Sequence, residues 1–213
     1  MMRSAIAVVL LAAGYGVCWA SPTGLNNIPT TDVVPQDVLV LQTWGLWGPG
    51  APAAHTVGLK YGPAAGLEIG ADWQATGAGS PGPLAFQAKY RVLDTPEGWG
   101  LTLGAANLAA GSAAMPYVVA SKALGDCHLY LGYSGQNSNE GLFWGADLAA
   151  TDRLTLRADW VQTHARQESL SSLGFLYGLS DQWAVEGWTS FPTDSAATYL
   201  LKLDYVLDFA SGA

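Results

Sequence analysis

Few side chains of this sequence have the types and spacing that catalysis or metal binding requires. His164 lies near Glu168 and Ser169, and an imidazole, a carboxylate and a hydroxyl are the groups of a nucleophilic hydrolase. Spacing along one stretch does not by itself make such a set, so we predict no catalytic residues and no enzyme. Cys127 and His128 would point to opposite faces of a strand and cannot share a metal ion. The glycine-rich stretches lack a lysine and a following helix, so we predict no cofactor.

Charged residues at every second position of apolar segments could instead act on solutes or ions by electrostatics. In "LTLRADW", residues 154–160, Thr155, Arg157 and Asp159 lie on one face of an extended chain and the apolar side chains lie on the other. A water-soluble sheet turns its apolar face to a core, whereas a membrane barrel turns it to lipid and encloses the charged face. The same alternation recurs in residues 67–73, 84–92, 142–148 and 199–209.

The elements that carry these residues are short strands. Alternating segments predict about twelve strands, which begin near residues 38, 54, 67, 84, 99, 115, 127, 141, 154, 170, 183 and 197. Several are about 9 to 11 residues long, the length that a tilted strand needs to cross a bilayer. Tight turns alternate with longer connections, as on the two rims of a transmembrane barrel. We therefore predict an all-β fold, an antiparallel up-and-down transmembrane β-barrel.

Composition divides the chain into three parts. Of the 213 residues 50% are hydrophobic and 12% are charged, yet after residue 20 no apolar run of about 18 residues could form a spanning helix. Residues 1–20 have the basic start, apolar run and small-residue end of a secretory signal peptide. Residues 21–36 carry three prolines and no alternation, which predicts an extended N-terminal arm, and residues 37–213 form the barrel. Basic patches are absent, so we expect no nucleic-acid partner.

The orientation of the strands follows from the cost of charge in lipid. A charged side chain at the bilayer midplane costs about 2–4 kcal/mol, and nearly every strand charge falls on one face, which we therefore place in the lumen. The predicted lumen-lining residues are Lys60, Glu68, Asp72, Gln87, Lys89, Arg91, His128, Asp147, Arg157, Asp159, Glu186, Lys202 and Asp204, and with them Gln74, Thr102, Lys122 and Tyr130. The predicted aromatic girdle comprises Tyr61, Trp73, Trp99, Tyr133, Trp144, Trp160, Tyr177, Trp183, Tyr205 and Phe209.

The C-terminal strand resembles that of a known family. "KLDYVLDF", residues 202–209, resembles the terminal strand of bacterial outer-membrane β-barrel proteins of the porin-like superfamily, although four residues follow Phe209 here. "YGLSDQWAVE" and "ATDRLTL" are similar to the turns and strands of that family. The resemblance implies a location in the outer membrane of a Gram-negative envelope, with outer-membrane lipids and the barrel assembly machinery as partners. "PTGLNNIPT" resembles the N-terminal segment of some barrels linked to exopolysaccharide export.

The sequence leaves several functions open. The lumenal charges are nearly balanced in sign, so they either pair into a network that fills the interior or separate onto opposite walls of a pore. Lumenal glycines leave room, so we predict a narrow, weakly selective diffusion channel for small solutes or ions. These glycines are Gly58, Gly70, Gly132, Gly145, Gly174 and Gly178. The alternatives are a non-conducting structural or envelope-associated barrel, including one for exopolysaccharide, and, more distantly, a surface lipid hydrolase. The arm either enters the lumen as a plug or lies beneath the barrel as a tether.

Overall fold

The computed structural model describes residues 23–49, 51–77, 82, 84–108, 113–135, 141–163 and 168–209. The predicted signal peptide, His164 and the four residues after Phe209 lie outside these ranges. Of residues 51, 52, 163 and 168 only the backbone is described. Within the described ranges, no helix is long and apolar enough to span a membrane.

Twelve strands occupy most of the described chain. They are β1 (Val38–Gly48), β2 (Ala51–Ala64), β3 (Leu67–Thr76), β4 (Leu84–Asp94), β5 (Trp99–Ala106), β6 (Met115–Leu124), β7 (Cys127–Ser134), β8 (Gly141–Ala149), β9 (Leu154–Thr163), β10 (Glu168–Gly178), β11 (Trp183–Pro192) and β12 (Thr198–Asp208). Nine of the twelve begin at the predicted residue, because alternation and turn residues mark those boundaries. The largest difference is β2, which begins at Ala51 and not near residue 54.

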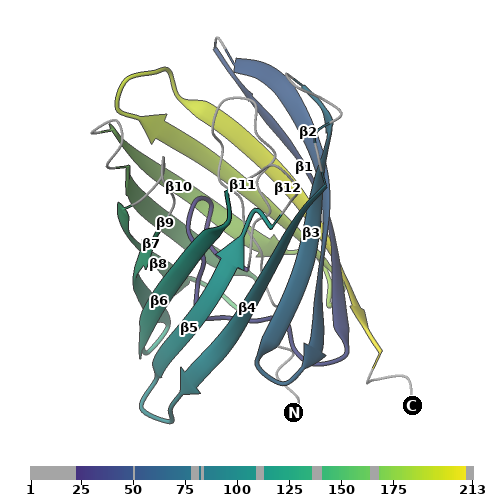
Figure 1. Ribbon diagram of the computed structural model, residues 1–213, viewed down its shortest axis with the longest axis vertical. Coiled ribbons are helices and arrows are strands. Elements are labelled where there is room, and N and C mark those ends of the chain that lie inside the picture. Colours follow the sequence, from purple (N-terminus) through teal and green to yellow (C-terminus); the bar gives the residue numbers. More distant parts are fainter. Residues whose placement is uncertain are drawn as a thin grey trace.

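The strands form one closed antiparallel barrel in which sequence neighbours are also spatial neighbours. The first and last strands close it, in a continuous register from Val38↔Asp208 to Trp47↔Tyr199. Each strand is tilted across the wall (Figure 1). The start of β1 and the end of β12 therefore lie at the end of the barrel that carries the tight turns, which we call the short-turn end. An up-and-down barrel has no free strand edge, so all its strands are paired.

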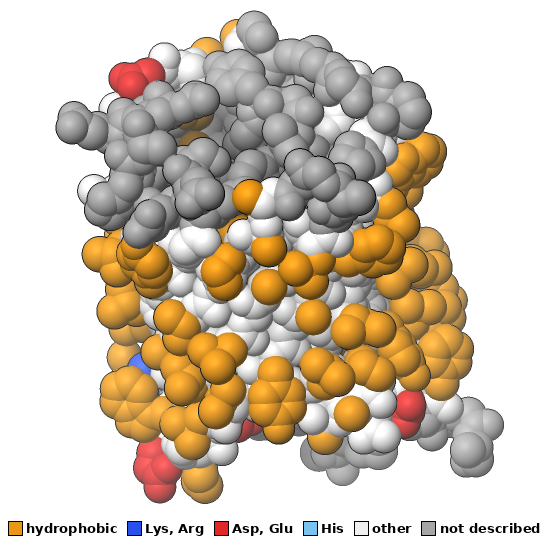
Figure 2. Space-filling view, in the orientation of Figure 1, with side chains coloured by type: hydrophobic (Ala, Val, Ile, Leu, Met, Phe, Trp, Pro, Cys, Tyr) orange, Lys and Arg blue, Asp and Glu red, His pale blue; other side chains and the backbone are white. Residues whose placement is uncertain are grey.

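The two faces of the wall differ as alternation requires. Large apolar side chains such as Leu131, Leu173 and Leu201 are exposed on the outside, while Lys60, Glu68 and other charged side chains are buried inside. In the view of Figure 2, hydrophobic side chains cover the wall between its two ends, and the charged side chains in sight lie toward those ends. A wall that is apolar outside and charged inside matches a lipid environment and excludes a water-soluble barrel with an apolar core.

Lys122 was predicted to line the lumen, and the structure places it outside. It pairs in register with Trp99, and its ammonium lies 4.8 Å from the centroid of that exposed ring. On β6 the inward positions are Tyr117, Val119 and Ser121. Lys122 thus occupies the outer wall near the short-turn end, where its amine also donates to the carbonyl of Glu97.

Candidate functional site: the lumen and the arm inside it

Residues 23–36, which we call the arm, lie inside the barrel. The purple chain in Figure 1 crosses the short-turn end and rises between the walls before it joins β1. Thr23, Leu25, Asn26 and Ile28 are almost fully buried although they belong to no strand. Of the two positions that the sequence left open, the structure shows the arm in the lumen and not beneath the barrel.

The prolines of the arm predicted an extended chain, but the structure shows that the arm is not extended throughout. Residues 23–30 fold back as a small hairpin, in which Leu25 N–H donates to the carbonyl of Ile28 and Thr30 N–H donates to that of Thr23. Gly24 and Pro29 form an isolated antiparallel bridge. Pro29 remains compatible with this hairpin because its missing N–H is not needed for these two bonds. Residues 23–30 are called the lumenal hairpin below.

Eleven of the thirteen predicted lumen-lining residues are buried inside the barrel, because they occupy the inward-facing alternate positions of their strands. They are Lys60, Glu68, Asp72, Gln87, Lys89, Asp147, Arg157, Asp159, Glu186, Lys202 and Asp204. The other two lie at the short-turn end, where Arg91 is partly exposed and pairs with Asp94 at 3.3 Å, and His128 is exposed and lies 3.1 Å from Asp147. A partly exposed mouth is the expected place for charges near the ends of their strands.

One set of charges pairs within the wall. The Lys202 ammonium lies 2.5 Å from Glu186, and the Arg157 guanidinium lies 3.4 Å from the same carboxylate. The Trp188 indole N–H donates to it as well, at 3.0 Å. On β2 and β3 Lys60 and Asp72 form an ion pair of 2.8 Å. Opposite charges at these distances pair with one another within the wall, which is the pairing alternative that the sequence left open.

A second set of charges binds the arm instead. Glu68 accepts hydrogen bonds from the backbone N–H of Thr23 at 2.9 Å and of Val34 at 3.0 Å, and from the Thr23 hydroxyl. The Lys89 ammonium donates to the carbonyls of Thr23 and Thr30 at 2.6 and 3.2 Å. Glu68 and Lys89 thus fix both ends of the lumenal hairpin near the short-turn end.

The tip of the hairpin binds the opposite wall. Asn27 donates to Asp159 from its backbone N–H at 2.8 Å and from its side-chain amide at 2.7 Å. Asn26 donates to the hydroxyls of Ser172 and Ser190 at 3.1 and 2.7 Å. Since Ser172 and Ser190 lie in the half of β10 and β11 farther from the short-turn end, the hairpin spans the lumen both across and along its axis.

Apolar side chains complete the contact between arm and wall. Leu25 and Ile28 belong to a buried cluster whose other members come from the strands, namely Trp44, Tyr117, Val119, Tyr130, Phe143, Trp188 and Leu200. A Cβ added to Gly145 would lie 2.5 Å from Leu25 Cδ1 and 2.7 Å from Ile28 Cδ1, so this glycine is where the hairpin touches the wall. Close approach of two chains is a usual reason for glycine in a strand.

The prediction that lumenal glycines leave open space was wrong. Side chains cover five of the six: Trp44 and Asp72 cover Gly58, Phe143 covers Gly132, and Trp188 covers Gly174, while Gly70 and Gly145 are covered by Lys60 with Gln87 and by Leu25 with Ile28. Tyr130 was predicted to line the lumen, whereas Trp44, Phe143 and Trp188 were not among the predicted lumenal residues. The alternation of residues along each strand could have predicted that these aromatic side chains face the lumen, because Phe143 shares a face with Asp147, and Trp44 shares one with Gln42.

The predicted girdle residues lie on the outer wall. Trp73, Trp99, Tyr133, Trp144, Tyr177, Trp183 and Phe209 are exposed, and Tyr61, Trp160 and Tyr205 are partly exposed. Neighbouring girdle rings contact one another, with centroids 6.5 Å apart for Trp144–Trp160 and 4.5 Å for Trp183–Tyr205. Amphipathic rings in this arrangement suit the two boundaries of a membrane.

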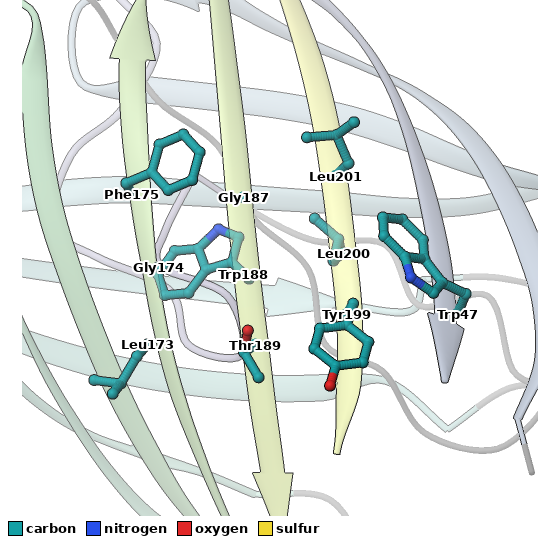
Figure 3. A pocket seen from close by; sticks show the side chains of 10 residues that line it. All are labelled: Trp47, Leu173, Gly174, Phe175, Gly187, Trp188, Thr189, Tyr199, Leu200 and Leu201. Atoms are coloured by element: carbon teal, nitrogen blue, oxygen red, sulfur yellow. The ribbon is translucent and has the colours of Figure 1, made fainter. Parts of the chain in front are cut away.

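The outer wall also has a shallow depression of about 350 Å³ over β10, β11 and β12. Figure 3 shows its cause. Gly187 has no side chain between Phe175 and Leu201, so the neighbouring apolar side chains project farther outward than the wall does at Gly187. The depression is open and mainly apolar, as expected of a surface in contact with acyl chains.

Groups for enzymatic or metal chemistry are not brought together in the described residues. Ser169, one of the three residues considered for hydrolysis, shares a hydrogen bond of 2.9 Å with Thr193, while His164 lies outside the described ranges. Cys127 is a free thiol. Within the part of the chain that the structure describes, no group of three or more His, Cys, Asp or Glu side chains could hold a metal ion.

The closed barrel, its apolar outer wall and its charged interior define a transmembrane β-barrel of the porin-like fold. No family model and no curated protein matches the sequence. Solved structures with the same fold include KdgM porin (TM-score 0.64, 13% identity, 78% of this chain and 98% of that chain) and NanC porin (0.59, 10%, 78% and 98%). KdgM porin in complex with disordered oligogalacturonate is similar too (0.61, 13%, 79% and 98%).

Proposed function

We propose that the chain is an outer-membrane channel for small solutes or ions, and that the arm closes it in the conformation described here. The observation that carries this proposal is the charged inner wall of a closed barrel with an apolar outer wall. Charged residues within a membrane-spanning protein are costly and mark solute or ion pathways. The likeness of the fold to porins agrees with this reading.

The charge of the inner wall favours weak selectivity. The buried lumenal cations are Lys60, Lys89, Arg157 and Lys202, and the buried lumenal anions are Glu68, Asp72, Asp147, Asp159, Glu186 and Asp204. Four positive groups against six negative ones, several of them paired with each other, produce only a small net field along the pore. We therefore expect a modest preference for cations once the arm is displaced, and no affinity for polyanions.

A non-conducting structural barrel is the second candidate, and the filled interior favours it. The apolar cluster around Leu25 and Ile28 occupies the middle of the lumen, as a core does in a barrel that needs no pore. In this case the arm would be a permanent part of the fold. The two candidates differ in what remains when the arm is removed.

Recording in planar lipid bilayers separates these candidates. The full-length mature chain is compared with a variant that lacks residues 21–35, which can still close its barrel because β1 pairs directly with β12. The channel proposal expects rare, brief openings for the full chain and sustained currents for the shortened one. Heat-modifiable gel mobility confirms that both are folded barrels. A folded, inserted, shortened barrel that passes no current would establish the structural role instead.

Membrane fractionation tests the proposed location. The protein should sediment with the outer membrane and resist extraction by alkali, because its outer wall is apolar. Recovery from the soluble periplasmic fraction would contradict an outer-membrane channel.

A further inference from the structure

The arm is separate from the hydrogen-bonded wall of the barrel. The described backbone–backbone hydrogen bonds of residues 23–34 are formed within the arm. The backbone first pairs with the wall where the arm meets β1, through the Gln36–Gly62 bridge and the hydrogen bond from Asp37 N–H to the carbonyl of Gly62. Every hydrogen bond described above between the lumenal hairpin and the wall involves a side chain of the wall and not its backbone. The hairpin can therefore leave the lumen without breaking any strand pairing.

The charges that bind the arm have a second possible partner. Glu68 and Lys89 face each other in register on β3 and β4. In the structure both bind the arm, Glu68 as acceptor and Lys89 as donor, and Glu68 also accepts a hydrogen bond of 3.0 Å from the side-chain amide of Gln87 on β4. A carboxylate and an ammonium at facing positions of neighbouring strands can equally pair with each other. Withdrawal of the arm would thus leave neither Glu68 nor Lys89 unpaired, which lowers the penalty for opening.

We propose that the arm is a reversible plug, and that Glu68 and Lys89 form the two-state element that holds or releases it. This inference rests on the proposed channel function. In the closed state the two side chains bind the backbone of Thr23, Thr30 and Val34. In the open state they pair with each other, and the hairpin withdraws through the short-turn end, where the arm joins β1. Two discrete arrangements of the same charges are what a switch requires.

Exchanging the two charges tests the element directly. The double variant Glu68→Lys, Lys89→Glu keeps opposite charges facing each other on β3 and β4. It places an ammonium against two backbone N–H groups and a carboxylate against two carbonyls, so the arm is repelled. The open probability in planar bilayers should rise at least about tenfold, the effect of losing one charge-assisted hydrogen bond.

The matched control exchanges the other ion pair of the same part of the wall. Lys60 and Asp72 lie 2.8 Å apart on neighbouring strands, and their double variant Lys60→Asp, Asp72→Lys should change the single-channel conductance, because both side chains line the lumen, but should raise the open probability less than the exchange of Glu68 and Lys89 does. A folded Glu68→Lys, Lys89→Glu barrel that remains as closed as the wild type would overturn the inference.

A cross-link tests whether the arm must move. The hydroxyl oxygens of Thr31 and Ser121 lie 2.6 Å apart, so Thr31→Cys with Ser121→Cys, in a Cys127→Ser background, can join the arm to β6 by a disulfide. Oxidation should abolish the rare openings, and a thiol reductant should restore them. The control Ser169→Cys with Thr193→Cys links wall to wall, where the hydroxyls lie 2.9 Å apart, and should not change the openings. Equal opening with the arm cross-linked would refute withdrawal.

The outcomes separate this inference from the channel function. If the variant lacking residues 21–35 is folded and passes no current, the channel function fails. If that variant conducts, while charge exchange and cross-linking both leave the full chain unchanged, the chain is a channel whose arm is a fixed constriction, and the switch is refuted.

Discussion

The charges on β9, β11 and β12 and those that face the arm lie in the same lumen but bind different partners. Arg157, Glu186 and Lys202 form what we call the wall network, in which three strands satisfy one another. Glu68, Lys89 and Asp159 form what we call the arm-binding group, and they hold the backbone and the Asn27 side chain of the arm. The first group belongs to the barrel, whereas the second belongs to the contact between barrel and arm.

This difference shows how one buried surface can be both rigid and switchable. A buried charge is tolerated only when it is paired, so the identity of its partner decides what can move. The partners of the wall network are fixed by strand register. The partners of the arm-binding group sit on a segment that forms no strand. Substitutions should therefore act on the first group independently of the arm, and on the second only when the arm is present.

Loss of the shared carboxylate should have the largest effect. Glu186→Ala leaves Arg157 and Lys202 buried without their partner, so the free energy of unfolding should fall by about 3–5 kcal/mol. The loss should be the same with and without residues 21–35. Urea unfolding in lipid vesicles, followed by tryptophan fluorescence, measures both values. A loss that depends on the arm would show that the two groups are not separate.

Loss of the acceptor at the hairpin tip should come next. Asp159→Ala removes a charged acceptor of two hydrogen bonds from Asn27, and the full chain should lose about 1.5–3 kcal/mol of unfolding free energy. In the variant lacking residues 21–35 the same substitution should be close to neutral, because those donors are gone. An equal loss in both backgrounds would place Asp159 in the wall network.

A neutral contact of the arm should contribute less. Ser121→Ala removes the partner of the Thr31 hydroxyl, and the expected loss in the full chain is about 1 kcal/mol. The same unfolding measurement on the shortened chain should show almost none of it. Persistence of the full loss there would mean that Ser121 stabilises the wall itself.

The smallest effect is expected for a charge outside both groups. Lys122 lies over the exposed ring of Trp99 near the short-turn end, and Lys122→Ala should cost about 0.5 kcal/mol whether or not the arm is present. Unchanged conductance of the full chain provides the second readout. A rise in open probability would show that the outer surface at this end also influences the arm.

Strand positions and faces were predictable where one face is polar and the other apolar. In β3 from Glu68 to Gln74 and in β9 from Thr155 to Asp159 every second residue is charged, polar or glycine, and the predicted parity is that of the structure. β6 lacks such alternation, since "MPYVVASKAL" is apolar on both faces near its start, and there Lys122 was placed on the wrong side. Only strand register, which pairs Lys122 with Trp99, decides its face.

The sequence predicted which residues line the lumen, but it did not predict that the lumen is filled. Parity identified Glu68, Lys89 and Asp159 as lumenal, and it could have identified Phe143 and Trp188 in the same way. It could not show that aromatic side chains lie over the glycines or that a hairpin fills the middle. Those facts depend on which strands face each other across the barrel, and local sequence carries no signal for that.

The sequence by itself determined that this chain is a barrel of about twelve strands with a charged interior, because period-two alternation and turn residues are local and most strands display them. Only the tertiary structure decided that the interior is occupied. Asn26 meets Ser190 although 164 residues separate them, and Glu68 meets Thr23 across 45. Such contacts arise when the barrel closes around the arm, since closure brings distant hydrogen-bonding groups together in a space that no single strand defines.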